Sequence, residues 1–563
     1  MIVTVVLVSL LVFIAGYRFY GAFLAKTVVL DDKCVTPACK INDGVDYVPA
    51  NPFMLLGQHF SAIAAAGPVV GPILAGIWFG WLPALLWIIL GSIFIGGVHD
   101  FTALAASIKN EASSIGEIVR KNMSKTAHIL FLIFVWLALV YVIIAFTDVT
   151  AQTFRIISKD NVAYGPGVAA SSILYLGLSV LMGVLLYKFK ANLGITTAVF
   201  IPLVLLVIWL GPRMPEGVLS ALSGVNAKQW DVILLIYCFI ASVIPMWLLL
   251  QPRGYLGGWL LYLTLAVGLI GSILGGFTIQ YPALNLDGLK SAANGKLIFP
   301  ILFITVACGA CSGFHGIVSS GTTSKQLMKE PDSLLVGYGA MLLEGLVAVL
   351  ALATVMMLAP GDEMLKSEPN MIYANGIAKY FGMLGVGYSV ALPFALLAFS
   401  TFVYDTLDVC TRLARYILQE LLGWKSVLSG YAATVLTLLL PVIFLMLTQE
   451  KGYLVAWPIF GTSNQLLASL TLLALSVWLV KTGKPAWFTI LPMIFMLTMT
   501  LWSLIVQVGD FVKVLPSLST GVTVKPDVII SGVVGIVLLV LSIVLVIEAY
   551  RVLSSKNTRR VIA

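Results

Sequence analysis

Residues 307–323 read ACGACSGFHGIVSSGTT and lie inside an apolar stretch that starts near Leu297. The position predicts burial in a bilayer, yet the four glycines weaken a helix, and the hydroxyls, thiols and imidazole are unusual there. Unwound backbone at membrane depth is stable only where protein or a watery cavity encloses it. An interrupted membrane helix with polar residues at the interruption is typical of a transporter's binding site.

The composition of the whole chain indicates an integral membrane protein. The chain has 563 residues, of which 60% are hydrophobic and 10% are charged. Its apolar stretches are long enough to cross a bilayer, and we expect an all-α polytopic fold with about fifteen spans. The net charge of +8 is spread over short loops. This pattern favours contact with the lipid bilayer and excludes a nucleic-acid-binding face.

The distribution of Lys and Arg predicts the orientation of the chain. With the C-terminus in the cytoplasm, the inside loops hold about twice as many of these residues as the outside loops. We therefore expect the N-terminus outside and the C-terminus inside. The six cysteines lie mostly within or beside spans, which predicts reduced thiols and no cofactor.

A second interruption lies at residues 66–72, which read AGPVVGP. Each proline there removes a backbone donor. Five expected spans begin with this interrupted helix and five more begin with the one at 307–323, in opposite directions across the membrane. This is the inverted-repeat plan of secondary transporters. We expect the following units: a peripheral span and loop (1–56), the first five-helix repeat (57–211), a two-helix insertion (212–297), the second repeat (298–480) and two peripheral spans (481–563).

Several blocks of the sequence resemble the carbon starvation protein A family. The blocks are DYVPAN (46–51), GQHFSAIA (57–64), GPVVGP (67–72), ACG (307–309), SGFH (312–315), SSGTT (319–323), FSTFVYDTLDVCTR (399–412) and FGTSNQLLA (460–468). The resemblance implies an inner-membrane importer of peptides or pyruvate-like carboxylates that serves during carbon starvation. It also implies a leucine-transporter-like architecture and a driving gradient of protons or sodium.

The two interruptions supply the expected substrate site. Half-helix N-termini offer partial positive charge to a carboxylate, and glycines let a substrate approach the backbone. A packing kink is the alternative for a single interruption, but two at matching positions favour a site. The expected substrate-binding residues are Gly67, Pro68, Gly71, Gly309, Ser312, Gly313, His315, Ser319, Asn464 and Gln465.

Other residues are candidates for ion coupling. Ser400 and Thr401 are hydroxyl donors that could complete a sodium site, or they bond back to their own helix. Asp405 and Asp408 share one helical face, and with Arg412 they could form a proton-sensitive ion-pair network or a solvated helix end. The expected ion-coupling residues are His59, Ala64, Gly67, Ser400, Thr401, Asp405 and Asp408.

Buried histidines and one glutamate complete the candidates. His315, His59 and the pair His99-Asp100 could titrate near neutral pH, although membrane histidines are often packing residues. Glu344 lies deep in its span and is a further coupling candidate. Cys308, Cys311 and His315 have the spacing of a soft-metal site but lack a fourth ligand, so we expect no metal.

The residues leave three functions to compare. A secondary transporter that works by alternating access is favoured. An intramembrane enzyme using Cys308, Cys311 and His315 is weaker, because no metalloprotease, nucleotide-binding or hydrolase motif is present. A channel is the third alternative. The sequence leaves open whether a peptide or a pyruvate-like carboxylate is carried.

Overall fold

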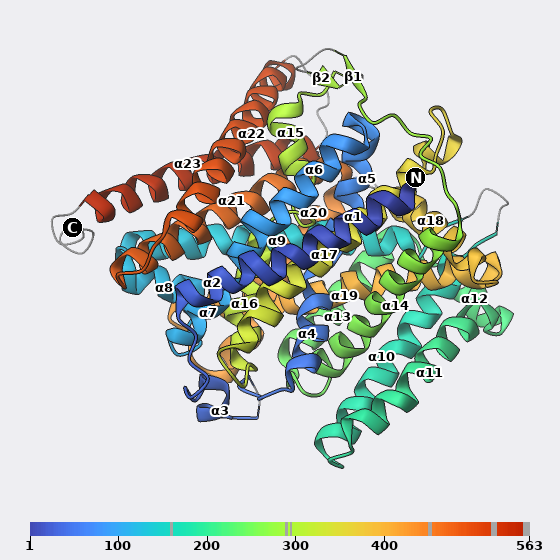
Figure 1. Cartoon of the computed structure of the whole chain (residues 1–563), viewed down its shortest axis with the longest axis horizontal. Helices are drawn as coiled ribbons and strands as arrows, with labels where there is room; N and C mark the ends of the chain where they lie inside the picture. The colour runs from blue at the N-terminus through green and yellow to red at the C-terminus, as the bar shows by residue number, and fades with distance from the viewer. Residues whose placement is uncertain are drawn as a thin grey trace.

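The computed structural model describes residues 1–44, 46–157, 162–287, 291–292, 295–448, 453–519 and 526–554. Nearly all regular structure in these residues is helical, and the helices pack into one bundle (Figure 1). One antiparallel pair of two-residue strands, β1 (Leu286–Asp287) and β2 (Ser291–Ala292), lies at the edge of the described bundle. The expected all-helical fold is confirmed.

The number of spans differs from the expected one. Among the described residues, twelve helices are long and apolar enough to cross a membrane, or thirteen with the bent pair α4–α5. The expected count of about fifteen is therefore not confirmed. Two of the expected spans fall short of this length: one contains α13 (Ala227–Val243), with 17 residues, and the other contains α15 (Ile298–Thr305) and α16 (Gly313–Gly321), with 8 and 9.

The N-terminal half holds the first interrupted segment. In chain order its elements are α1 (Ile2–Ala15), the π-helical turn η1 (Gly16–Gly21), α2 (Ala22–Val28), α3 (Pro37–Ile41), α4 (Pro52–Ile63), α5 (Gly67–Phe79), α6 (Trp81–Gly91), η2 (Ser92–Gly96), α7 (Gly97–Lys109), α8 (Ile115–Asn122), α9 (Lys125–Thr153), α10 (Gly165–Tyr187), α11 (Leu193–Leu210), η3 (Gly211–Arg213), α12 (Glu216–Ser223), α13 and α14 (Leu250–Leu274).

The C-terminal half holds the second interrupted segment. Its elements are α15, α16, η4 (Thr323–Lys325), η5 (Leu334–Gly339), α17 (Ala340–Met356), η6 (Glu363–Lys366), α18 (Pro369–Met383), α19 (Tyr388–Leu422), α20 (Val427–Leu447), α21 (Tyr453–Lys481), α22 (Trp487–Ser519) and α23 (Pro526–Ser554). The long helices α9 and α19 pack along each other, and α19 also contacts α4, α14 and α16.

Local sequence signals explain where the helices start and stop. The Ser124 hydroxyl accepts the Ala127 backbone N–H at the start of α9, and Asn226 forms a reciprocal capping box with Gln229 at α13. At the first interruption α4 stops at Ile63, and α5 leaves at an angle of 46°. Pro68 stands in the first turn of α5, where its missing N–H costs nothing.

The two interrupted segments run in opposite directions. The Ala50 N–H, just before α4, donates to the Gln326 carbonyl beyond α16 over 2.9 Å. At the other end, the Asn285 N–H, upstream of α15, donates to the Phe79 carbonyl at the end of α5 over 3.0 Å. Figure 1 shows the same relation, with α4 and α16 low in the view and α5 and α15 high. The antiparallel arrangement expected from the sequence is therefore present.

Candidate functional site

The two interruptions meet in the interior of the bundle. A Cβ placed on Gly67 would lie 2.3 Å from the Cys308 sulfur, and one on Gly71 would lie 2.4 Å from the Thr305 carbonyl oxygen. Only glycine permits this approach, because real Cβ contacts are never that short. The structure thus brings Gly67 against Cys308 and Gly71 against the end of α15.

The start of α16 is closed by α21. Oδ1 of Asn464 accepts the Phe314 backbone N–H over 3.0 Å, and its amide also contacts the Ser312 hydroxyl, with Nδ2 2.9 Å from Oγ. A Cβ on Gly313 would lie 2.3 Å from the backbone nitrogen of Ala468. Asn464 therefore satisfies a free N–H of the half-helix. The predicted positive helix end exists, and in this conformation a side chain occupies it.

Carbonyls freed by the second interruption are also held by side chains. The Trp87 indole donates to the Val306 carbonyl over 2.9 Å, and the Ser92 hydroxyl donates to the Gly309 carbonyl over 3.1 Å. The Gln465 amide donates to the Phe303 carbonyl at α15. The unwound backbone is thus enclosed by protein, as its depth requires.

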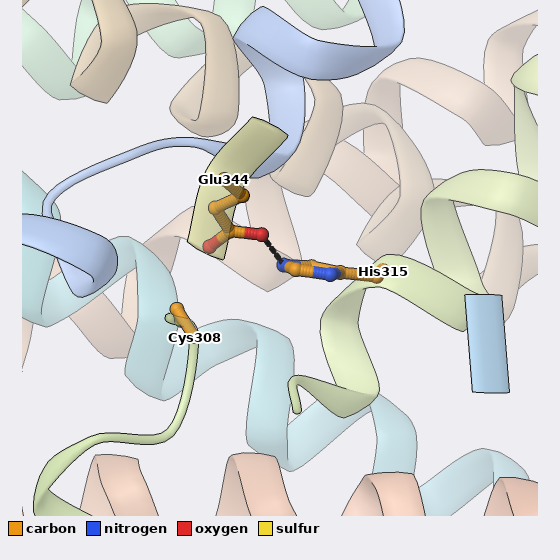
Figure 2. A group of neighbouring side chains, drawn as sticks. All are labelled: Cys308, His315 and Glu344. Atoms are coloured by element: carbon orange, nitrogen blue, oxygen red, sulfur yellow. Dashed lines mark ion pairs between the residues drawn. The ribbon is translucent and has the colours of Figure 1, made fainter. Parts of the chain in front are cut away.

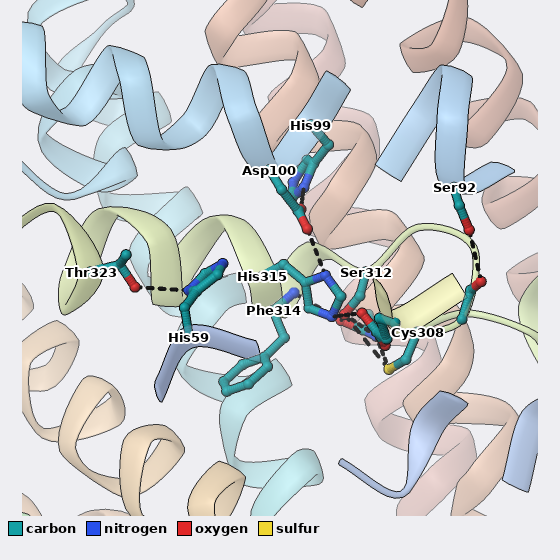
Figure 3. A network of polar contacts seen from close by, with 12 residues as sticks. His59, Ser92, His99, Asp100, Cys308, Ser312, Phe314, His315 and Thr323 are labelled. Atoms are coloured by element: carbon teal, nitrogen blue, oxygen red, sulfur yellow. Dashed lines mark hydrogen bonds and ion pairs between the residues drawn. The ribbon is translucent and has the colours of Figure 1, made fainter. Parts of the chain in front are cut away.

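Next to this backbone lies a chain of histidines and acids, which Figure 3 draws in part. Asp100 accepts on both carboxylate oxygens: Oδ1 is 2.7 Å from His99 Nδ1 and Oδ2 is 2.8 Å from His315 Nδ1. The other ring nitrogen of His315, Nε2, lies 3.2 Å from Oε2 of Glu344. All four side chains are fully buried. We call them the histidine–acid cluster; it joins α7, α16 and α17.

Glu344 points at His315 from α17 (Figure 2). Cys308 lies beside it in the non-helical connection between α15 and α16. The sulfur of Cys308, a nitrogen of His315 and a carboxylate oxygen of Glu344 lie within 4.8 Å of one another. The Asn464 amide donates to this sulfur, however, and the thiol donates to Ser312. A closed zinc site needs four ligands, so we assign no metal to this group.

A second buried group lies between α14 and α19. Nη2 of Arg253 is 2.6 Å from Oδ1 of Asp405, and Nη1 is 2.7 Å from Oδ2 of Asp408. The Tyr237 hydroxyl donates to Asp408 over 2.8 Å, and the Ser61 hydroxyl of α4 donates to Asp405. All of these charged atoms are buried. We call the five residues the arginine–aspartate cluster.

The expected partner of the two aspartates was wrong. Arg412 lies one helical turn beyond Asp408 but donates to the backbone carbonyls of Ala241 and Ile244. Arg253 of α14 holds both aspartates instead. It is the only charged residue of α14, and an ionisable residue within a span was the signal that could have found it.

One of the two hydroxyls expected near the first interruption bonds within its own helix. Ser400 donates to the Leu396 carbonyl of its own helix over 2.9 Å. Thr406 of α19 is the residue that reaches α4, donating to the Ala62 carbonyl over 2.8 Å. His59 contacts the Thr323 hydroxyl through Nδ1 over 2.9 Å (Figure 3). Thr406 was missed, because several hydroxyls on one helix give no signal of which one faces a given partner.

Cavities flank the closed interior at both ends of α9. One of 220 Å³ lies where α8, the end of α16 and α19 meet, and its lining includes Ser320, Lys325 and Glu420. Another, of 400 Å³, lies between the last turn of α9 and the start of α18, and its lining includes Arg155 and Asn370. The buried clusters lie in a bundle that is hollowed on two sides.

Comparisons with known proteins show the family of the chain. The family described as "Carbon starvation protein CstA" matches residues 1–370 and 362–503. The peptide transporter CstA of Helicobacter pylori (strain ATCC 700392 / 26695) is 34% identical over 574 residues, covering 89% of this chain and 81% of that protein. The peptide transporter CstA of Escherichia coli (strain K12) is 32% identical over 570 residues, covering 88% of this chain and 80% of that protein.

Two further similarities have lower identity. The pyruvate/proton symporter BtsT of Escherichia coli (strain K12) is 28% identical over 593 residues, covering 89% of this chain and 81% of that protein. A solved structure of the manganese transporter of Eremococcus coleocola aligns with a TM-score of 0.45 at 13% identity, covering 91% of this chain and 99% of that one.

Proposed function

Because the chain belongs to the family of carbon starvation protein CstA, we propose that it is a secondary active transporter that imports peptides or pyruvate-like carboxylates. The observation that carries the proposal is the meeting of two antiparallel interrupted helices around buried polar groups. A site that is closed to both sides of the membrane takes up or releases a substrate only if the surrounding helices move. The relatives are named as transporters, so the enzyme alternative based on Cys308, Cys311 and His315 is not favoured.

The substrate is proposed to bind at the meeting point of the interruptions. The amide of Asn464 and the hydroxyl of Ser312 lie at the N-terminus of α16, where an incoming carboxylate gains from the helix end. Displacing Asn464 would free the Phe314 N–H for that carboxylate. We retain as substrate-binding residues Gly67, Pro68, Gly71, Gly309, Ser312, Gly313, His315, Ser319, Asn464 and Gln465.

We propose protons as the coupling ion, in line with the name of the pyruvate/proton symporter BtsT. The hydroxyl of Ser400 bonds within its own helix, which weakens the case for a sodium site at this position. Acids and histidines are plentiful in the interior, where they are costly and usually functional. The ion-coupling candidates remain His59, Ala64, Gly67, Ser400, Thr401, Asp405 and Asp408.

In an alternating-access mechanism the five units of the chain would have different roles. The repeats 57–211 and 298–480 would move against each other and open the site in turn toward the two flanking cavities. Segments 1–56 and 481–563 would support them from outside, and segment 212–297 supplies Arg253 to the interior. We propose an inner-membrane location with the N-terminus outside and the C-terminus in the cytoplasm.

Uptake by purified protein in proteoliposomes tests the proposal. Labelled pyruvate is offered with an inward proton gradient, an inward sodium gradient or neither, and unlabelled di- and tripeptides are added as competitors. We expect saturable accumulation with the proton gradient alone, because a carrier converts that gradient into substrate movement. If neither labelled pyruvate nor a labelled tripeptide accumulates above protein-free liposomes under any gradient, the proposal is wrong.

A further inference from the structure

The histidine–acid cluster places a ring nitrogen of His315 opposite the carboxylate of Glu344. A carboxylate accepts hydrogen bonds and cannot donate, so the Nδ1 atoms of His99 and His315 both donate to Asp100. A neutral His315 then presents a lone pair at Nε2 toward Glu344, whose nearer oxygen is 3.2 Å away. An ionised Glu344 would place a second lone pair opposite the first.

No hydrogen bond from the described residues reaches either carboxylate oxygen of Glu344, and none reaches His315 Nε2. Both side chains are fully buried and out of contact with bulk solvent. An isolated buried carboxylate is strongly destabilised. One proton placed between Oε2 and Nε2 removes the repulsion and gives each atom a partner.

We propose that Glu344 and His315 hold the coupling proton between them, with Asp100 fixing the orientation of the imidazole. The inference rests on the proposed function and assigns its coupling site. Asp100 orients His315 through Nδ1 in the way that a carboxylate orients a metal-bound histidine. The proton enters from the side of higher proton concentration and leaves on the other side with the substrate.

Among the described residues, no lysine or arginine forms an ion pair with this cluster. The ion pairs of the cluster involve only His99, Asp100, His315 and Glu344. The thiols of Cys308 and Cys311 lie on the connecting backbone, α4 brings His59 close to His315, and α21 contributes the neutral Asn464. The charge of Glu344 is therefore neutralised by a proton or not at all.

The position of the pair connects protonation to movement. His315 lies in the first turn of α16, the half-helix whose N-terminus forms the substrate site, whereas Glu344 lies on α17. A shared proton ties these two helices together. Its loss leaves two facing lone pairs and pushes α16 away from α17. Substrate binding at the start of α16 and proton binding at its first turn thus act on the same short helix.

Glu344→Gln tests the inference, because an amide keeps the shape of the side chain but cannot carry the proton. In proteoliposomes we expect this variant to lose accumulation driven by a pH gradient, down to the level of protein-free liposomes. It should retain counterflow, the exchange of labelled for unlabelled substrate at equal pH, because the substrate site is intact. The matched control is Glu363→Gln, which removes an exposed carboxylate that pairs with Lys366, and it should behave as the wild type.

Infrared spectroscopy gives a readout that does not depend on transport. A pH titration of the wild type should show the C=O stretch of a protonated carboxyl group that disappears at high pH, and this signal should be absent from Glu344→Gln and present in Glu363→Gln. If Glu344→Gln does not insert, the same titration of Glu344→Asp should show the signal at a shifted frequency.

The outcomes separate the two proposals. Wild-type protein that accumulates neither substrate under any gradient refutes the proposed function. A wild type that accumulates substrate together with a Glu344→Gln variant that does so equally well refutes the proton site alone. An unchanged carboxyl signal in Glu344→Gln does the same.

Discussion

The two clusters hold buried carboxylates in different ways. In the arginine–aspartate cluster a permanent cation, Arg253, binds two carboxylates within 2.7 Å. The Ser61 hydroxyl donates to the second oxygen of Asp405, and the Tyr237 hydroxyl donates to the Asp408 oxygen that Arg253 also contacts. In the histidine–acid cluster every charged partner is titratable, and Glu344 accepts no hydrogen bond from the described residues. The first cluster contains a permanent cation, whereas the second contains only groups that gain or lose a proton.

This difference predicts separate roles for the two clusters, one in stability and one in coupling. Arginine stays protonated in proteins and binds carboxylates with a rigid fork, so the first cluster suits a fixed connection between α14 and α19. Histidine and a buried glutamic acid exchange protons readily, so the second suits a switch. We therefore expect substitutions in the first cluster to change stability and substitutions in the second to change coupling.

The largest effect is expected from Arg253→Met. Removal of the cation leaves Asp405 and Asp408 buried and unpaired, and loss of one partner of a buried pair costs about 3–5 kcal/mol. We expect a marked fall in the free energy of unfolding, measured by titration from mild detergent into dodecyl sulfate. The variant that also carries Asp405→Asn and Asp408→Asn should recover most of this loss, and failure to recover would show that Arg253 acts through packing instead of charge.

Glu344→Gln should show the opposite pattern. Because Glu344 accepts no hydrogen bond among the described residues, its replacement should change the free energy of unfolding by no more than about 1.5 kcal/mol. The pH dependence of substrate counterflow should flatten, since the titrating group is gone. Asp405→Asn is the comparison, and a flat pH profile in that variant as well would assign coupling to both clusters.

Two glycines allow a matched steric perturbation of the clusters. A Cβ on Gly257 would lie 2.5 Å from Oδ2 of Asp405, and one on Gly316 would lie 2.8 Å from Cε1 of His99. Overpacking of this kind costs about 1–3 kcal/mol. Gly257→Ala should mainly lower the midpoint of thermal unfolding, whereas Gly316→Ala should mainly lower proton-driven uptake relative to counterflow. The reverse result would contradict the separate roles of the two clusters in stability and coupling.

The smallest effect is expected from Ser61→Ala. Its hydroxyl donates to Asp405, which keeps its two bonds from Arg253 in the variant. A single polar contact in a membrane protein contributes about 1 kcal/mol or less. We expect a small fall in the free energy of unfolding and an unchanged pH profile of uptake. A changed profile would place Ser61 in the coupling pathway, since the hydroxyl itself carries no charge.

Several features of the site could be predicted from the chain because they depend on local chemistry. The glycines and prolines of 66–72 and the glycines of 307–323 disfavour a continuous helix wherever they lie, and both interruptions are present. Glu344 and Asp100 were candidates because carboxylates in spans are costly. The pairing of Asp405 with Arg412 failed because it rested on distance along one helix, whereas the true partner is 152 residues away.

The sequence by itself determined that this protein crosses the membrane, that two of its helices are interrupted and which family it resembles. Apolar runs, backbone propensities and motif blocks are written locally in the chain, so no tertiary information was needed. Only the tertiary structure decided that Arg253 holds the two aspartates and that His315 lies between Asp100 and Glu344. Those contacts join helices far apart in sequence. The free-energy cost of a buried charge depends on which partner the packing places within hydrogen-bond distance.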